Sequence, residues 1–259
     1  LTHDKVILIE IDIKPGDILN PAKIEESISR LQRTGHFSSN EITTLEAGTN
    51  IAKRTVLIKV TERDPGIYTI GAGATNENNG TLRGYSGVAY RNIGGWGRRV
   101  SARVEGNYNF ADVKYLESKI IIGAVEPYLL DTRARLRVSV TRSRSITDIN
   151  IKKVTELNLG VVSIEQDFTS HVTAIWNLWS VATYIDHGIS PEDERRYGYN
   201  YESLVIGSIG PSLDVDYRDN IFNPAKGSYS RLSVEYASAF LSNNNVDDFV
   251  RVTGQSTWY

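Results

Sequence analysis

The sequence predicts a mainly β protein, in which a small α+β domain over residues 1–64 precedes a partial transmembrane antiparallel β-barrel over residues 65–259. Two observations carry the barrel. Beyond residue 66, about ten segments alternate apolar and polar residues with a period of two. These segments are long: a strand of roughly nine residues or more can cross a bilayer at a tilt. Ordinary globular strands average about five or six residues.

Composition excludes several classes of protein. The chain has 259 residues, with 29 Lys and Arg against 31 Asp and Glu, so it lacks the basic excess of a nucleic-acid binder. It has no cysteine and four scattered histidines, so we expect no metal site and no cofactor. No run reaches the roughly 18 apolar residues of a membrane-spanning helix. The chain does not begin with Met, so we expect it to be processed or part of a longer one.

A helix is predicted over residues 21–34. Asn20 can cap its N-terminus, and Pro21 suits the first helical position. Apolar residues then recur every three or four positions up to Leu31, which gives the helix one buried stripe. Gly35 lies just past the end, where a left-handed residue commonly closes a helix.

Two short strands are predicted after this helix, over residues 41–46 and 55–62. Residues 6–13 are ambiguous, because their β-branched content favours a strand while polar residues just upstream could cap a short helix. Residues 63–66 combine Asp, Pro and Gly, so we place the domain boundary there.

The charged face of the alternating segments is expected to line a wet lumen, and the apolar face to contact lipid. Arg133, Arg135 and Arg137 illustrate the charged face, and aromatic residues gather near the segment ends, as at membrane interfaces. A soluble β-sandwich or lipocalin-like barrel would also alternate, without this combination. We predict strands over residues 67–75, 82–92, 98–109, 114–126, 132–142, 150–165, 171–186, 201–217, 229–240 and 249–259.

The connections between strands also differ in length. Those at 92–98, 127–132 and 167–170 are short. Those at 143–150, 187–200 and 241–248 are longer, although the connections at 76–81 and 111–113, which alternate with the short set, are not. Outer-membrane barrels have short periplasmic turns and longer external loops. We therefore expect the short set on the side of the N-terminal domain.

One turn, at residues 216–227, has recognisable chemistry. Pro224 fixes φ and Gly227 permits a positive φ, so the chain can reverse sharply. Asp219 and Asn223 can hydrogen-bond nearby backbone, and Lys226 precedes the glycine. We interpret these five residues as structural.

Three motifs resemble the BamA/TamA-type outer-membrane assembly factors, in which POTRA domains precede a bacterial surface antigen barrel. Leu31, Gly35 and Phe37 match a Leu-x-x-x-Gly-x-Phe helix end of POTRA domains. Residues 216–227 and 92–97 are similar to periplasmic turns of those barrels. The resemblance implies that residues 1–64 lack the first POTRA strand, so that the ambiguous segment near the start is a helix. It also implies a fragment whose further barrel strands lie beyond Tyr259.

The resemblance implies a function: folding and inserting outer-membrane β-barrel proteins by templating their strands at a lateral gate. Glycines at 66, 71 and 73 would let another backbone approach the first barrel strand. The expected location is the outer membrane of a Gram-negative-type bacterium, with the N-terminal domain in the periplasm. Expected partners are the lipid bilayer, unfolded β-barrel substrates and accessory periplasmic or lipoprotein subunits, and no nucleic acid. The candidate pairing residues are Ile67, Tyr68, Thr69, Ile70, Gly71, Ala72 and Gly73.

Other functions compete with this one. A two-partner secretion pore of the same superfamily would export a polypeptide. A passive porin or adhesin would not carry residues 14–62, and a soluble periplasmic binding module of β type would not need the membrane. No serine lies in a recognisable Ser/His/Asp arrangement, so we do not expect an enzyme.

Overall fold

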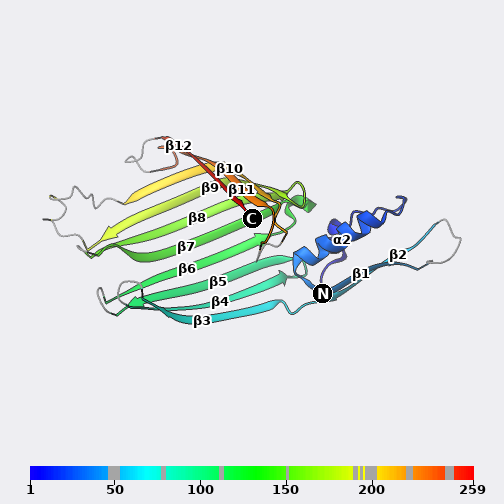
Figure 1. Ribbon diagram of the computed structural model, residues 1–259, viewed down its shortest axis with the longest axis horizontal. Coiled ribbons are helices and arrows are strands. Elements are labelled where there is room, and N and C mark those ends of the chain that lie inside the picture. Colours follow the sequence, from blue (N-terminus) through cyan, green and yellow to red (C-terminus); the bar gives the residue numbers. More distant parts are fainter. Residues whose placement is uncertain are drawn as a thin grey trace.

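The protein, seen as a computed structural model, is described over residues 1–45, 53–76, 80–110, 114–149, 152–188, 192, 195, 203–219, 224–242 and 248–259. A small α+β unit is followed by a ten-stranded antiparallel sheet that curls into part of a barrel (Figure 1). Among the described residues, no helix is both long and apolar enough to span a membrane.

The α+β unit consists of helices α1 (Asp4–Glu10) and α2 (Pro21–Thr34) and an antiparallel hairpin of β1 (Phe37–Thr44) and β2 (Val56–Glu62). Helix α2 packs against β1 (Figure 1). Residues 6–10 of the ambiguous segment are thus helical, as the family resemblance implied and its β-branched content did not. Just beyond this helix, the Asp12 N–H donates to the Ser27 hydroxyl of α2 at 2.9 Å.

Helix α2 begins and ends as predicted. The Asn20 side chain accepts a hydrogen bond of 3.0 Å from the Ala22 N–H, and Gly35 takes a left-handed φ of 71°. Leu31 is fully buried, and Phe37 is 5% exposed. Because Phe37 is part of this core and pairs with β2, β1 begins four residues before the predicted strand.

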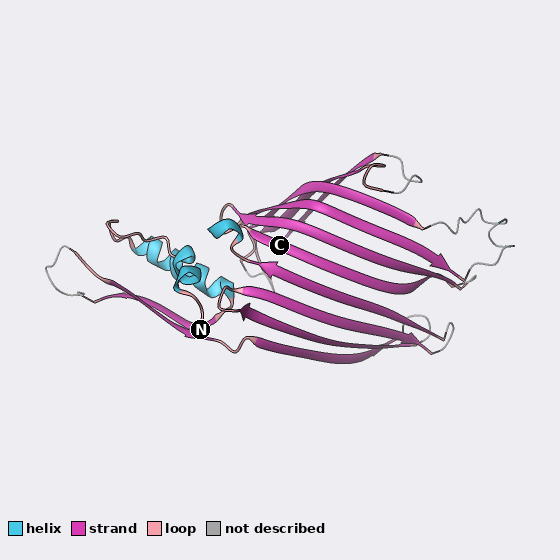
Figure 2. Ribbon diagram, turned by 180° about the vertical axis from the view of Figure 1, so that it is seen from behind, coloured by secondary structure: helices cyan, strands magenta, loops and turns pink. Residues whose placement is uncertain are grey.

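Each strand of the large sheet pairs with its neighbours in the chain, which gives a meander (Figures 1 and 2). The strands are β3 (Gly66–Thr75), β4 (Thr81–Ile93), β5 (Arg98–Asn109), β6 (Tyr115–Glu126), β7 (Arg135–Asp148), β8 (Lys153–Asp167), β9 (Val172–His187), β10 (Leu204–Asp216), β11 (Ser228–Ala237) and β12 (Phe249–Trp258). A 3-10 turn, η2 (Leu129–Asp131), lies between β6 and β7.

The two faces of the sheet differ in chemistry. On β7, Val138 and Val140 lie on the outer face and are 40% and 55% exposed. Arg135 and Arg137 point to the inner face, where both form ion pairs with Glu165 of β8. At this end of β7 and β8 the apolar side chains point outward and the charged ones inward, as the alternation predicts.

Strand β7 is longer than predicted, because it runs to Asp148 through most of the loop expected at residues 143–150. Its distal residues, 141–148, are polar except for Ile146 and show no apolar alternation. They remain in the sheet because their backbones pair with β8, for example Ser143 with Leu157.

Strand β8 departs from the expected pattern of faces. Leu157, Leu159 and Val161 lie on the inner face, opposite small polar residues of β7. On the outer face Glu156 forms ion pairs with Arg142 and Arg144. A period of two shows that the faces alternate, but it does not show which face is turned inward.

The N-terminal unit lies at the end of the sheet that carries the short turns (Figure 2). The His3 N–H donates to the Gly95 carbonyl in the β4–β5 turn at 2.9 Å. Lys5 forms an ion pair of 2.6 Å with Asp131 in the β6–β7 connection. These short connections therefore face the N-terminal unit, as predicted. Length alone does not separate the two ends of the sheet, because the β7–β8 connection at the far end spans only residues 149–152.

Candidate functional site

Strand β3 is the first strand of the large sheet and lies at its border (Figure 1). Within the described part of the chain it pairs with β4 alone, from Gly66 opposite Tyr90 to Thr75 opposite Thr81. All the candidate pairing residues, 67–73, lie on this strand.

The hydrogen-bond pattern shows which backbone groups of β3 face away from β4. The Arg91 N–H donates to the Pro65 carbonyl at 2.9 Å, in the same register as the β3–β4 ladder. In an antiparallel ladder, hydrogen-bonded and non-hydrogen-bonded pairs alternate. The N–H and C=O groups of Gly66, and of every second residue after it, therefore point away from β4. We call these groups the β3 edge; they belong to Gly66, Tyr68, Ile70, Ala72 and Ala74.

The same residues carry the outward-facing side chains of β3. Tyr68 and Ile70 are 63% and 71% exposed. Because side-chain direction and hydrogen-bond direction both alternate with a period of two, the β3 edge is flanked by an apolar outer face. An apolar hollow on this face is lined by Tyr68, Val88 and Val100 together with their neighbours on β3 to β6.

Gly71 and Gly73 have different surroundings on the inner face. A Cβ at Gly71 would overlap the ring of Tyr85, its partner on β4, whereas a Cβ at Gly73 would meet nothing within 4 Å. The Arg103 guanidinium lies 4.3 Å from the centroid of the Tyr85 ring and forms an ion pair with Glu105 at 2.6 Å. Gly71 is therefore needed for close packing against Tyr85, whereas the described residues leave the space beside Gly73 unfilled.

The predicted turn motif forms a hydrogen-bonded reversal between β10 and β11. The Asp219 carboxylate accepts hydrogen bonds from the backbone N–H groups of Ala225 at 3.0 Å and Lys226 at 3.2 Å. Gly227 has a φ of 106°, which a residue with a side chain rarely adopts. Pro224 lies at the start of its described part, and Asn223 lies outside the described residues.

A buried histidine lies where the N-terminal unit meets the barrel. The Arg91 side chain of β4 donates to the Gly35 carbonyl at 3.2 Å, and the adjacent His36 is 6% exposed. Burial, together with the nearby charges of Arg99 and Arg91, lowers the pKa of His36 to about 4. His36 is thus neutral at pH 7.

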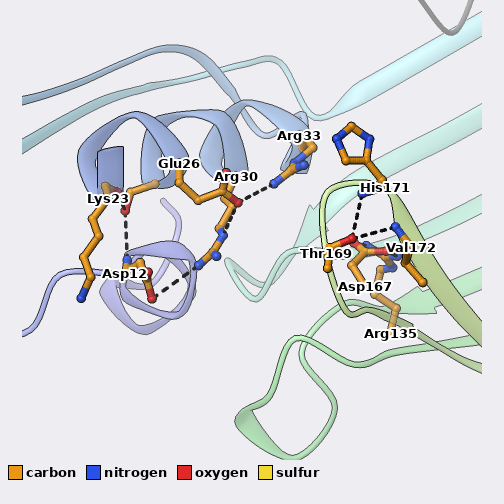
Figure 3. Close-up of polar contacts among 11 residues, drawn as sticks. Asp12, Lys23, Glu26, Arg30, Arg33, Arg135, Asp167, Thr169, His171 and Val172 are labelled. Atoms are coloured by element: carbon orange, nitrogen blue, oxygen red, sulfur yellow. Dashed lines mark hydrogen bonds and ion pairs between the residues drawn. The ribbon is translucent and has the colours of Figure 1, made fainter. Parts of the chain in front are cut away.

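A cavity of about 320 Å³ lies where α2 faces the inner side of the barrel end; we call it the mouth cavity. Figure 3 shows Arg30 and Arg33 on α2, and Arg135 paired with Asp167 at the end of the sheet. The acidic residues that line the mouth cavity are Glu10, Glu26 and Asp167. Its arginines are Arg30, Arg33, Arg99, Arg133, Arg135 and Arg137.

Ion pairs hold several of these side chains in place. Arg135 binds Asp167 through two hydrogen bonds of 2.8 and 2.7 Å, and Glu26 accepts from Arg30 at 2.8 Å and from Arg33 at 3.2 Å. Burial raises the pKa of the remaining acid, Glu10, although a hydrogen bond with Tyr128 opposes this shift. The lining holds six arginines and three acids, and Glu165 and Asp12 beyond it also pair with three of these arginines, so a small positive excess remains.

No short sequence motif predicts this cavity, because its arginines come from α2, from β5, from β7 and from the connection before β7. The alternating arginines before and within β7 predict only a charged lumen. Their meeting with α2 depends on how the two parts of the chain dock.

Comparisons with known families identify both parts of the chain. The model of the Omp85 superfamily domain matches residues 92–259. The POTRA model, described as the surface antigen variable number repeat, matches residues 1–63. No curated protein matches the sequence.

Solved structures share the fold at low sequence identity. BamA from Haemophilus ducreyi lacking POTRA domains 1–3 is 13% identical with a TM-score of 0.65, over 91% of this chain and 46% of that one. CdiB from Acinetobacter baumannii is 11% identical with a TM-score of 0.54, over 98% and 44%. CdiB from Escherichia coli is 12% identical with a TM-score of 0.57, over 98% and 48%. The chain thus spans less than half the length of each structure.

Proposed function

The chain belongs to the Omp85 superfamily, and on that premise we propose that it folds and inserts outer-membrane β-barrel proteins. The observation that carries the proposal is the β3 edge. Its backbone donors and acceptors are turned away from β4 and are bordered by exposed apolar side chains. Such an edge can pair with an incoming strand, which is β-augmentation.

A lipid environment favours pairing at this edge. Backbone N–H and C=O groups that are unpaired in a bilayer cost several kcal/mol each, roughly, so an opened β3 edge would strongly favour a new partner strand. Gly66 and Gly73 leave open space beside the strand, where another backbone can approach. A substrate strand that pairs there would template the next substrate strand, and successive pairings would build a new barrel.

The remaining assignments follow from this role. Residues 1–64 would form a POTRA-type unit in the periplasm, and residues 65–259 the membrane barrel of a Gram-negative-type outer membrane. The N-terminal unit would capture unfolded substrates or accessory subunits by strand addition at its own hairpin. The work is pairing and partitioning, so we propose neither an enzymatic step nor a cofactor.

A secretion pore is the second candidate. It is favoured by the charged inner face, where Arg135 and Arg137 meet Glu165, and the fold is similar to CdiB as well as to BamA. A porin or adhesin fits less well, because the POTRA model matches residues 1–63.

Reconstitution separates these functions. The full-length protein is placed in liposomes, and an unfolded outer-membrane barrel protein is added from outside. Assembly predicts that the added protein becomes heat-modifiable and protease-resistant faster than with empty liposomes. A secretion pore predicts instead that a soluble polypeptide crosses the bilayer, with no acceleration of barrel insertion, and that result would refute the proposal.

A further inference from the structure

The mouth cavity contains buried donors without acceptors. Within the described residues, Arg30 Nη1 and Arg135 Nε are buried and have no hydrogen-bond partner. Arg30 Nη1 lies 3.7 Å from the nearest Asp12 oxygen, which is an ion pair but too long for a hydrogen bond. A buried guanidinium N–H without an acceptor is costly, so negative charge placed close to these two arginines is favoured.

Two further arginines of the lining are not part of an ion pair with any described residue. Over the part of the chain that the structure describes, the guanidinium groups of Arg99 and Arg133 have no hydrogen bond and no ion pair, although both line the cavity. His36, next to them, stays neutral at pH 7 and therefore neither repels nor neutralises a bound anion. Of the two, Arg133 is close enough to Glu10 to lower the pKa of that acid, so Arg99 is the arginine whose charge no described acid compensates.

We propose that the mouth cavity binds the carboxylates of an acidic polypeptide segment, held between Arg99 and Arg133 as the substrate passes the periplasmic end of the barrel. This inference rests on the proposed function, because it takes a substrate chain as the occupant. A guanidinium presents its N–H groups as a fork that matches a carboxylate.

The cavity itself favours a peptide carboxylate over a lipid phosphate. Arg135 already binds the Asp167 carboxylate there through two parallel hydrogen bonds. The cavity opens on the inner, charged side of the sheet rather than on the apolar outer face. Its volume of about 320 Å³ is at the lower end of ligand pockets, and its lining is mostly charged and polar, which suits carboxylate side chains better than acyl chains.

Peptide binding to the full-length protein in nanodiscs tests the proposal. Fluorescein-labelled hexaglutamate and hexaglutamine are titrated at low ionic strength, and fluorescence anisotropy is measured. We expect saturable binding of hexaglutamate alone, weakened by added salt. Arg99→Gln should weaken it about tenfold, which corresponds to about 1.4 kcal/mol. Arg133→Gln, in a connection rather than a strand, gives a second test if the first variant folds poorly.

Arg98→Gln is the matched control, because Arg98 is the next residue in β5, points to the outer face and pairs with Glu126. It should bind hexaglutamate as the wild type does. Equal binding of the two peptides, or unchanged binding by both cavity variants, would overturn the proposal. So would inorganic phosphate that displaces hexaglutamate at equal or lower concentration, since the site would then select a phosphate.

The same preparations separate this inference from the proposed function. A protein that inserts barrels but binds no hexaglutamate overturns the peptide site alone. A protein that binds hexaglutamate through Arg99 but inserts no barrel supports the carboxylate site and overturns the assembly function.

Discussion

Replacing Ala72 by proline should impair substrate assembly while leaving the protein's own sheet paired. Ala72 lies opposite Gly84 in a non-hydrogen-bonded pair, so its N–H belongs to the β3 edge and not to the β3–β4 ladder. Proline removes that donor, and proline is tolerated where the lost N–H does not serve the sheet. The substitution therefore affects the β3 edge and not the pairing of β3 with β4.

The magnitude follows from one lost hydrogen bond. The carbonyl of the incoming strand that would accept from Ala72 is left unpaired, at a cost of about 1–3 kcal/mol. At about 1.4 kcal/mol per factor of ten, substrate pairing should weaken by about 5- to 150-fold. Ala72→Val keeps the donor and the outward direction of the side chain, and should assemble substrate at close to the wild-type rate.

The assay follows the insertion of an unfolded barrel protein into liposomes that contain each variant. Heat-modifiability of the variant itself reports whether its own barrel is intact. If Ala72→Pro is folded and inserts substrate as fast as the wild type, the templating role of the β3 edge is refuted.

Two further predictions concern stability. Gly71→Ala should destabilise the barrel by about 1–3 kcal/mol, because a Cβ there overlaps the Tyr85 ring, whereas Gly73→Ala should stay within about 0.5 kcal/mol; thermal unfolding in detergent measures both. His36 stays neutral down to about pH 4 when folded and titrates near 6.5 when unfolded. The contribution of His36 to the free energy of unfolding is therefore complete above pH 6.5 and falls by about 3 kcal/mol as the pH drops to 4. Hydrogen exchange in the N-terminal unit should show this loss, and His36→Gln should reduce it.

Each of these has a clear contrary result. Equal melting temperatures for Gly71→Ala and Gly73→Ala would mean that Tyr85 moves away at no cost. Exchange that accelerates between pH 6.5 and 4 to the same extent in wild type and His36→Gln would place the pH sensitivity in another group.

The sequence predicted elements whose signals are local. Strand β5 was predicted over residues 98–109 and forms there, because strict alternation runs between two turn sequences. Helix α2 was predicted to the residue, since Asn20, Pro21 and Gly35 each satisfy a terminus of that helix. Domain docking and edge direction have no comparable local signal.

The features that were not predicted depend on pairing across the chain. The distal half of β7 is polar and reads as a loop, and only its ladder with β8 keeps it extended. The inward direction of Leu157 is set by the register with β7 and not by its own hydrophobicity. The mouth cavity forms only where α2 meets strand ends that are about a hundred residues away in the chain.

Disulfide cross-linking to a stalled substrate tests the role of β3 most directly, and the chain contains no cysteine that would interfere. Single cysteines are introduced at Ala72 and, as a control in the middle of the sheet, at Ile122, an outward residue that is 56% exposed. A substrate with one cysteine in its terminal strand is trapped during assembly. We expect the disulfide at position 72 and not at position 122. Equal cross-linking at both positions, or none at position 72, would contradict strand templating at β3.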